Sequence, residues 1–229
     1  MRATAIILAG GNGSRMNLKT PKQRLKIAGE TVLERCLKIF QKTDIVTDII
    51  LVSSSEEFDF SKGVAEKFDK VRKIVIGGNT RAESAKCGFE AVDFECDLVA
   101  IHDACRCLVR SSDIEAVISD ALKYGGATAS TKITDTVKLA DSKGNIEKTV
   151  DREALRAVQT PQAFRYDLYK IAISNIKVFD EGITDDNSLF EKSGFTVHLT
   201  ETDRNNVKIT YKSDIEYAKF LLESGICDD

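Results

Sequence analysis

Apolar and polar positions alternate in blocks along the first part of the chain. Five short runs rich in apolar and β-branched residues predict strands: ATAIILA (3–9), TDIILVSS (47–54), VRKIVIGG (71–78), CDLVAIHDA (96–104) and GATAST (126–131). Stretches with helical spacing lie between them, including TRAESAKCGFEAV at 80–92. Strands that alternate with helices are typical of β-α-β units, so we expect an α/β fold with a mainly parallel sheet flanked by helices.

Another predicted helix, at 30–42, indicates which of its faces is buried. Its apolar residues recur at helical spacing, so one face is expected to lie on the sheet. That face consists of Val32, Leu33, Cys36, Leu37 and Phe40.

The sequence SDIE occurs twice, and each copy predicts a helix start. We expect each serine to accept a hydrogen bond from an early backbone N–H while Glu115 or Glu216 reaches back. Helices are therefore predicted at 113–124 and 214–224.

The pattern changes after residue 131. DTVKLA (135–140) and NIEKTV (145–150) flank the turn-prone sequence DSKG, which predicts an antiparallel hairpin. We therefore expect one domain over residues 1–229 with a β-arm inserted at about 135–160. The remaining predicted elements are helices at 167–177 and 185–193 and strands at TVHLTE (196–201) and NVKIT (206–210).

Composition narrows the classes of partner. Lys and Arg number 33 against 36 Asp and Glu, and this net charge of −3 gives no general attraction to nucleic acid or anionic membranes. No run approaches the roughly 18 apolar residues of a membrane span, and the chain enters its first strand without a secretory pattern. The six cysteines lack paired metal-ligand spacing, so we expect reduced thiols. Together these features favour a cytoplasmic protein that binds neither nucleic acid nor membrane.

A glycine cluster directly after the first strand is a candidate phosphate site. Without a Cβ, residues such as Gly10, Gly11 and Gly13 let backbone N–H groups approach phosphate oxygens. Their spacing matches neither the dinucleotide fingerprint nor the GxxxxGK[ST] phosphate loop, and a tight turn with nothing bound remains an alternative. Arg15 and Lys22 favour the phosphate site. Pro21 stiffens the chain just before Lys22, which suits an ammonium that must meet a phosphate.

Polar residues also follow two other predicted strands. GGNTRAES (77–84) and HDACR (102–106) lie at the carboxyl edge of the expected sheet, where open α/β sheets bind ligands. Asp103 could hold Mg²⁺ together with substrate phosphates, or it could instead cap a helix or pair with Arg106. Lys208 lies inside an expected strand, where a charge must be paired, solvated or functional.

The two histidines, His102 and His198, do not indicate a serine hydrolase. There is no GxSxG sequence, and adjacent side chains such as His102 and Asp103 diverge in an extended strand. A Ser-His-Asp mechanism is therefore disfavoured.

Seven segments together resemble one protein family over nearly the full chain: LAGGNGSRM…PKQ, GGNTRAES, HDACR, DTVK, DREALRAVQTPQAF, TDDNSL and NNVKIT. Their order and spacing are similar to those of the 2-C-methyl-D-erythritol 4-phosphate cytidylyltransferases of the non-mevalonate isoprenoid pathway. Many nucleotidyltransferases share the glycine loop with PKQ, whereas the other segments narrow the resemblance to enzymes acting on sugar-alcohol phosphates. The resemblance implies a Rossmann-like nucleotidyltransferase fold and a homodimer in which the β-arm exchanges contacts.

The resemblance also implies roles for individual residues. CTP would be bound by Ala9, Gly10, Gly11, Asn12, Gly13, Gly78, Asn79, Arg81, Ser84, Asp103, Ala104 and Arg106. The catalytic cations would be Arg15, Lys22, Arg152 and Lys208, with Arg152 reaching the neighbouring subunit's site. The polyol phosphate would lie near Thr136, Thr160, Thr184 and Asp185, and Asp103 would be the metal ligand.

The sequence departs from the family pattern in three places. Cys105 and Cys107 flank Arg106 where Ala-Arg-Pro is usual, so a turn beside the nucleotide loses its proline. Arg24 replaces the aromatic residue after PKQ, which adds a cation near the loop, and Gly10 replaces a common alanine.

The expected reaction is CMP transfer from CTP to methylerythritol phosphate with release of pyrophosphate. An ionised phosphate oxygen attacks the α-phosphorus, so no general base is required, and cations with Mg²⁺ offset the repulsion between the two polyanions. Ribitol 5-phosphate or another polyol phosphate is the alternative substrate. The alternatives of another class are a non-catalytic nucleotide-binding regulatory module and a dehydrogenase, the latter disfavoured by the glycine spacing.

Overall fold

The computed structural model describes residues 1–11, 20–175 and 183–227. Its central sheet has seven strands in the order β11-β7-β10-β6-β1-β4-β5. Their bounds are β1 Ala3–Leu8, β4 Val46–Ser53, β5 Val71–Ile76, β6 Leu98–Asp103, β7 Gly126–Lys132, β10 Arg156–Arg165 and β11 His198–Glu201. Neighbouring strands are parallel except at β10, which runs antiparallel to both β6 and β7. The predicted α/β fold with a mainly parallel sheet is confirmed.

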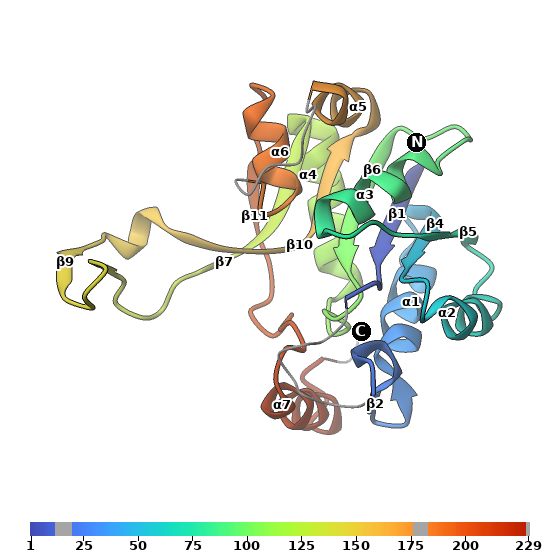
Figure 1. The fold of residues 1–229 in the computed structure, drawn as a ribbon, viewed down its shortest axis with the longest axis horizontal. Coiled ribbons are helices and arrows are strands. Elements are labelled where there is room, and N and C mark those ends of the chain that lie inside the picture. Colours follow the sequence, from blue (N-terminus) through green and yellow to red (C-terminus); the bar gives the residue numbers. More distant parts are fainter. Residues whose placement is uncertain (12–19, 176–182, 228–229) are drawn as a thin grey trace.

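Helices cover both faces of this sheet (Figure 1). Their bounds are α1 Val32–Lys42, α2 Phe58–Ala65, α3 Arg81–Glu90, α4 Ser111–Tyr124, α5 Tyr166–Asn175, α6 Asp186–Lys192 and α7 Lys212–Glu223. One core contains buried residues of α1, α2, α4 and α7, and the other contains those of α3, α5 and α6. The predicted buried face of α1 is confirmed, because all five of its apolar residues are fully buried.

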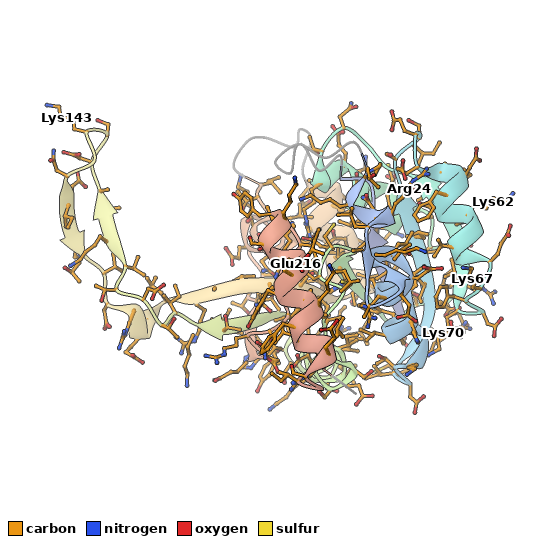
Figure 2. The ribbon with its side chains drawn as sticks, turned by 90° about the horizontal axis from the view of Figure 1, so that it is seen from below. Arg24, Lys62, Lys67, Lys70, Lys143 and Glu216 are labelled. Atoms are coloured by element: carbon orange, nitrogen blue, oxygen red, sulfur yellow. The ribbon has the colours of Figure 1, made fainter. Side chains whose placement is uncertain are left out.

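The inserted arm projects from the body of the molecule. β7 and β10 run toward it, and it carries β8 (Lys138–Ala140), β9 (Ile146–Thr149) and the short 3-10 helix η3 (Arg152–Ala154) (Figure 1). β8 and β9 pair antiparallel, and the Asp141 carboxylate closes their turn by accepting hydrogen bonds from the backbone N–H groups of Lys143 and Asn145. Figure 2 shows Lys143 at the arm's end, far from the body. The predicted hairpin is confirmed.

Two local predictions are wrong, and the first concerns the SDIE sequences. Helix α4 begins at Ser111 with Arg110 as N-cap and has no side-chain cap, so Ser112 and Glu115 do not form the expected capping box. At α7, the carboxylate of Asp214 accepts hydrogen bonds from the backbone of Thr210 and Tyr211, both at 2.7 Å. The aspartate inside SDIE therefore replaces the serine as the capping residue, because this helix starts earlier than predicted.

The second wrong prediction is a strand at NVKIT. Residues 206–210 form no strand, and among their hydrogen bonds to the core is one from the Ile209 backbone N–H to the Cys105 carbonyl at 2.8 Å. The segment instead passes across the end of the sheet. Lys208 is thus not a charge within a β-ladder.

Several elements lack a signal in the sequence pattern. The antiparallel strand β10, the helix α2 and the short pieces β2 (Lys26–Ile27), β3 (Glu30–Thr31) and η2 (Lys22–Arg24) were not predicted. β10 holds arginine, glutamine and proline as well as apolar residues, which obscures its period. Within the described ranges, no helix combines the length and apolar character that crossing a membrane requires.

Candidate active site

A cavity of about 510 Å³ lies at the carboxyl ends of β1, β4, β5 and β6. The sequence analysis predicted the polar motifs at this edge of the sheet, since the carboxyl ends of parallel strands lie at the same edge. Among the predicted site residues, those that line it are Gly10, Gly11, Gly78, Asn79, Arg81, Ser84, Asp103 and Lys208. Four stretches that are distant in the sequence therefore meet in one cavity.

The glycine loop forms one wall of the cavity and is held by a side chain that the sequence reasoning overlooked. The Gln23 amide nitrogen donates hydrogen bonds to the backbone carbonyls of Ala9 and, at 3.1 Å, Gly11. Gln23 is 1% exposed, and Ala9 is also buried, with its N–H bonded to the Val52 carbonyl. Gln23 belongs to the PKQ sequence, which was the available signal. The predicted residues Asn12, Gly13 and Arg15 lie outside the described residues.

A second wall is built by the start of α3. The Thr80 hydroxyl accepts a hydrogen bond from the Glu83 N–H, and the Glu83 carboxylate accepts from the N–H groups of Thr80 and Asn79. This capping box fixes the turn that precedes the helix. Arg81, the first helical residue, is thereby directed at the end of β6.

Asp103, the last residue of β6, forms ion pairs with two cations that lie far apart in the chain. Arg81 Nε donates to one carboxylate oxygen at 3.0 Å, and Lys208 Nζ donates to the other at 2.6 Å. Burial by itself would raise the pKa of Asp103, but the charges of Arg81 and Lys208 lower it overall. Asp103 is therefore ionised, and of the roles proposed for it, ion pairing is observed. Its partners are Arg81 and Lys208 rather than Arg106.

Lys22 contacts the segment that carries Lys208. Pro21 is extended (φ −56°, ψ 144°) and leads into η2, where Lys22 is 7% exposed. Its ammonium donates to the Ile209 carbonyl at 3.2 Å, next to Lys208 in the chain. Both lysines lower the pKa of the neighbouring Cys105 thiol, although burial dominates and raises it to about 11. Lys22 and Lys208 thus converge, whereas the cavity lining includes only Lys208.

Two other residues expected at the nucleotide, Ala104 and Arg106, do not line the cavity. Ala104 is fully buried, and Arg106 donates to the Asn206 carbonyl at 2.9 Å. Burial lowers the pKa of Arg106. Their expected contact with nucleotide stays a prediction.

The residues expected at the polyol phosphate do not line this cavity. Thr160 is buried and its hydroxyl accepts from the Asp103 N–H at 3.1 Å, so it fixes the position of Asp103. Asp185 caps α6 by accepting from the Ser188 N–H, and Thr184 is exposed beside Ser188. Their role in binding substrate stays a prediction.

Thr136 and Arg152 lie at the base of the arm. Both are exposed, and Arg152 donates to the Thr134 carbonyl at 2.7 Å. Neither residue lines the cavity in this chain, and their role at a neighbouring subunit's site stays a prediction.

A metal cluster is not found within residues 1–11, 20–175 and 183–227, where no three carboxylate, histidine or cysteine side chains group together. Asp103 is the predicted ligand, and it lines the cavity with an ionised carboxylate. One such carboxylate suits Mg²⁺ that takes most of its ligands from substrate phosphates.

Arg24, which departs from the family pattern, does not bring a free cation to the cavity. Its Nε lies 2.6 Å from the Glu57 carboxylate, and its guanidinium stacks 4.7 Å from the centre of the Phe60 ring. The charge expected near the loop is therefore neutralised.

Comparison with known proteins shows the family of this chain. The family model for IspD, 2-C-methyl-D-erythritol 4-phosphate cytidylyltransferase, matches residues 3–224. A curated protein of that name from Caldanaerobacter subterraneus is 40% identical over 227 residues, which is 97% of this chain and 99% of the relative. One from Clostridium acetobutylicum is 40% identical over 226 residues, covering 96% and 97%. The crystal structure of 4-diphosphocytidyl-2C-methyl-D-erythritol synthase from Anaerococcus prevotii superposes with a TM-score of 0.82 at 32% identity and 96% coverage of both chains.

A mainly parallel sheet with a polar cavity at the carboxyl ends of its strands is typical of α/β enzymes that bind nucleotides, and the comparisons show that this one is a cytidylyltransferase. The chain belongs to the 2-C-methyl-D-erythritol 4-phosphate cytidylyltransferase family.

Proposed function

We propose that this protein transfers CMP from CTP to 2-C-methyl-D-erythritol 4-phosphate, giving 4-diphosphocytidyl-2-C-methyl-D-erythritol and pyrophosphate. The observation that carries the proposal is the cavity in which the glycine loop faces Arg81, Asp103 and Lys208. A backbone loop suited to binding phosphate thus lies beside two cations in a chain of this family, which supports the proposal.

The chemistry needs charge placement more than proton transfer. A phosphate oxygen of the polyol substrate attacks the α-phosphorus of CTP in line and expels pyrophosphate. Because that oxygen is already ionised, the neutral, buried His102 is not needed as a base. Lys22 and Lys208 stabilise the charge that develops on the phosphates, and Arg15 and Arg152 are proposed to complete the set of cations.

Mg²⁺ is proposed as the cofactor, held by Asp103 and the triphosphate oxygens. When bound, it would neutralise phosphate charge. Asp103 then serves two purposes, since its carboxylate also orients Arg81 and Lys208.

We also propose a homodimer formed through the arm. Leu139 and Ile146 on the arm and Val158 at its base are 52%, 66% and 40% exposed, so the arm offers apolar surface that a second copy of the chain could cover. A crossing arm would carry Thr136 and Arg152 to the partner's cavity.

We propose a cytoplasmic location, which suits six cysteines that are all free.

A pyrophosphate-release assay tests the proposal. Purified protein is supplied with Mg²⁺ and each combination of CTP, UTP or ATP with methylerythritol phosphate or ribitol 5-phosphate. Release with CTP and methylerythritol phosphate above all other pairs is expected. Preference for ribitol 5-phosphate would replace the substrate, and CTP binding without release for any pair would indicate a regulatory module.

A further inference from the structure

We propose that Asp186 is a positioning residue that, with Tyr169, holds the Arg81 guanidinium in the nucleotide cavity. The inference rests on the proposed function and adds to it two residues outside the predicted site. Arg81 Nη1 donates to Asp186 at 2.7 Å, while its Nε donates to Asp103 at 3.0 Å. One guanidinium is thus held between two carboxylates.

Asp186 acts only through its partners. Its side chain is 3% exposed and does not line the cavity, so a bound nucleotide would not touch it. Both carboxylate oxygens are occupied, one by Arg81 and the other by the Tyr169 hydroxyl, which donates at 2.6 Å. Tyr169 is fully buried. The pair therefore has no solvent-facing role.

The backbone of Asp186 is fixed as well. Its N–H donates to the Gln162 side-chain carbonyl at 2.9 Å, and Gln162 is a buried residue of β10, the strand beside β6. The carboxylate is consequently anchored to the same sheet that carries Asp103. A shift of α6 relative to the sheet would move Arg81.

Two carboxylates together stabilise the charge of Arg81 and fix its orientation, which one carboxylate alone would not do. Burial by itself would lower the pKa of Arg81, but Asp186 and Asp103 raise it overall, so the charge is stable inside the wall. A guanidinium whose nitrogens donate to two different carboxylates is held in one orientation, whereas a guanidinium in a single ion pair can rotate. Because Arg81 lines the cavity, its orientation should set the affinity for the nucleotide.

The test is steady-state kinetics of Asp186→Asn, which keeps the shape of the side chain and removes its charge. We expect the KM for CTP to rise by roughly tenfold or more, the size typical of losing a charged hydrogen bond. kcat and the KM for the polyol phosphate should change by less than about threefold, since neither attack nor that substrate involves Arg81. Tyr169→Phe removes only one hydroxyl and should raise the KM for CTP in the same direction by a smaller factor.

Asp48→Asn is the matched control. Asp48 is also 3% exposed and is bound by two arginines, Arg2 at 3.1 Å and Arg72 at 3.7 Å, but it lies near the amino end of β4, away from the cavity. Its variant should lose stability without a change in the KM for CTP.

The outcomes separate this inference from the proposed function. If wild-type protein releases pyrophosphate from CTP but folded Asp186→Asn keeps its KM for CTP, the positioning role is wrong. An equal rise in Asp48→Asn would reduce the effect to general destabilisation and also overturn it. Should Asp186→Asn fail to fold, an unchanged KM in Tyr169→Phe overturns the inference. Wild-type protein without activity on CTP would overturn the proposed function and this inference with it.

Discussion

The Lys208 ammonium lies 2.6 Å from the Asp103 carboxylate, although 105 positions separate the two residues in the chain. Arg81 holds the other oxygen of the same carboxylate. Asp103 therefore keeps two cations at the cavity edge, where a triphosphate would offer both of them further anionic partners.

Replacing Lys208 should impair catalysis without unfolding the protein. Lys208→Met keeps the side chain's length and removes its charge, and we expect turnover to fall by at least about tenfold because a transition-state charge partner is lost. Pyrophosphate release and a thermal melt measure the two effects. Lys212→Met, in the exposed first turn of α7, is the control and should retain turnover. Wild-type turnover in a folded Lys208→Met protein would contradict the assigned role.

Lys22→Ala should lower both turnover and stability. Turnover is expected to fall by at least about tenfold. In addition, Lys22 is buried and bonded to the Ile209 carbonyl, so its loss leaves that carbonyl unpaired at a cost of about 1–3 kcal/mol. Activity assays combined with urea unfolding distinguish the two losses. If neither turnover nor the free energy of unfolding changed, Lys22 would have no role in the site.

Gln23→Leu should loosen the glycine loop. The variant leaves the carbonyls of Ala9 and Gly11 without their donor, so we expect the KM for CTP to rise roughly fivefold, about 1 kcal/mol of lost positioning. Gln41→Leu is the control, because Gln41 bonds only the backbone of Lys70, outside the cavity lining. Equal KM values for the two variants would show that Gln23 does not support the loop.

His102 should make the protein less stable in mild acid. Burial lowers its pKa to about 3, below the unfolded value of 6.5, so protons bind preferentially to the unfolded chain as the pH falls through this interval. The free energy of unfolding should therefore decrease by about 2 kcal/mol between pH 7 and pH 5. Urea unfolding at both values measures it. His102→Gln should show a flatter dependence, and an equally steep one would assign the acid sensitivity to other groups.

The arm should mediate dimerisation. Ile146→Lys places a charge on its exposed apolar surface and is expected to weaken the dimer by at least about tenfold in Kd, measured by sedimentation equilibrium. Phe220→Lys on α7, where Phe220 is 59% exposed, is the matched control and should leave the dimer intact. A monomeric wild-type protein would refute the interface.

A mixing experiment tests whether the arm completes a partner's site. Subunits with Arg152→Ala and subunits with Lys208→Met are each expected to have reduced turnover alone, and they should regain part of the activity when dissociated and reassociated together. That recovery requires one intact site assembled from two chains. No recovery in mixed dimers would place both residues in the same subunit's site.

The sequence pattern was informative wherever local chemistry decides structure. The period of α1 identified its buried face, the DSKG turn identified the hairpin of the arm, and glycines and polar residues after apolar strands identified the edge of the sheet at which the cavity lies. These features depend on neighbouring residues and on the rule that parallel strands end together. The seven motifs on which the resemblance rests indicated the family, which the comparisons confirm.

The tertiary structure decided which side chains meet. No local signal states that Asp186 and Tyr169 hold Arg81, that Gln23 clamps the glycine loop, or that residues 206–210 cross the end of the sheet instead of joining it. Each of these depends on strand order and helix docking, which bring together groups separated by up to 105 positions in the case of Arg81 and Asp186. The periodicity of the sequence determines whether a segment forms a helix or a strand. The contacts between segments form only when the cores on both faces of the sheet pack, because the free energies of burial and of ion pairing depend on the whole fold.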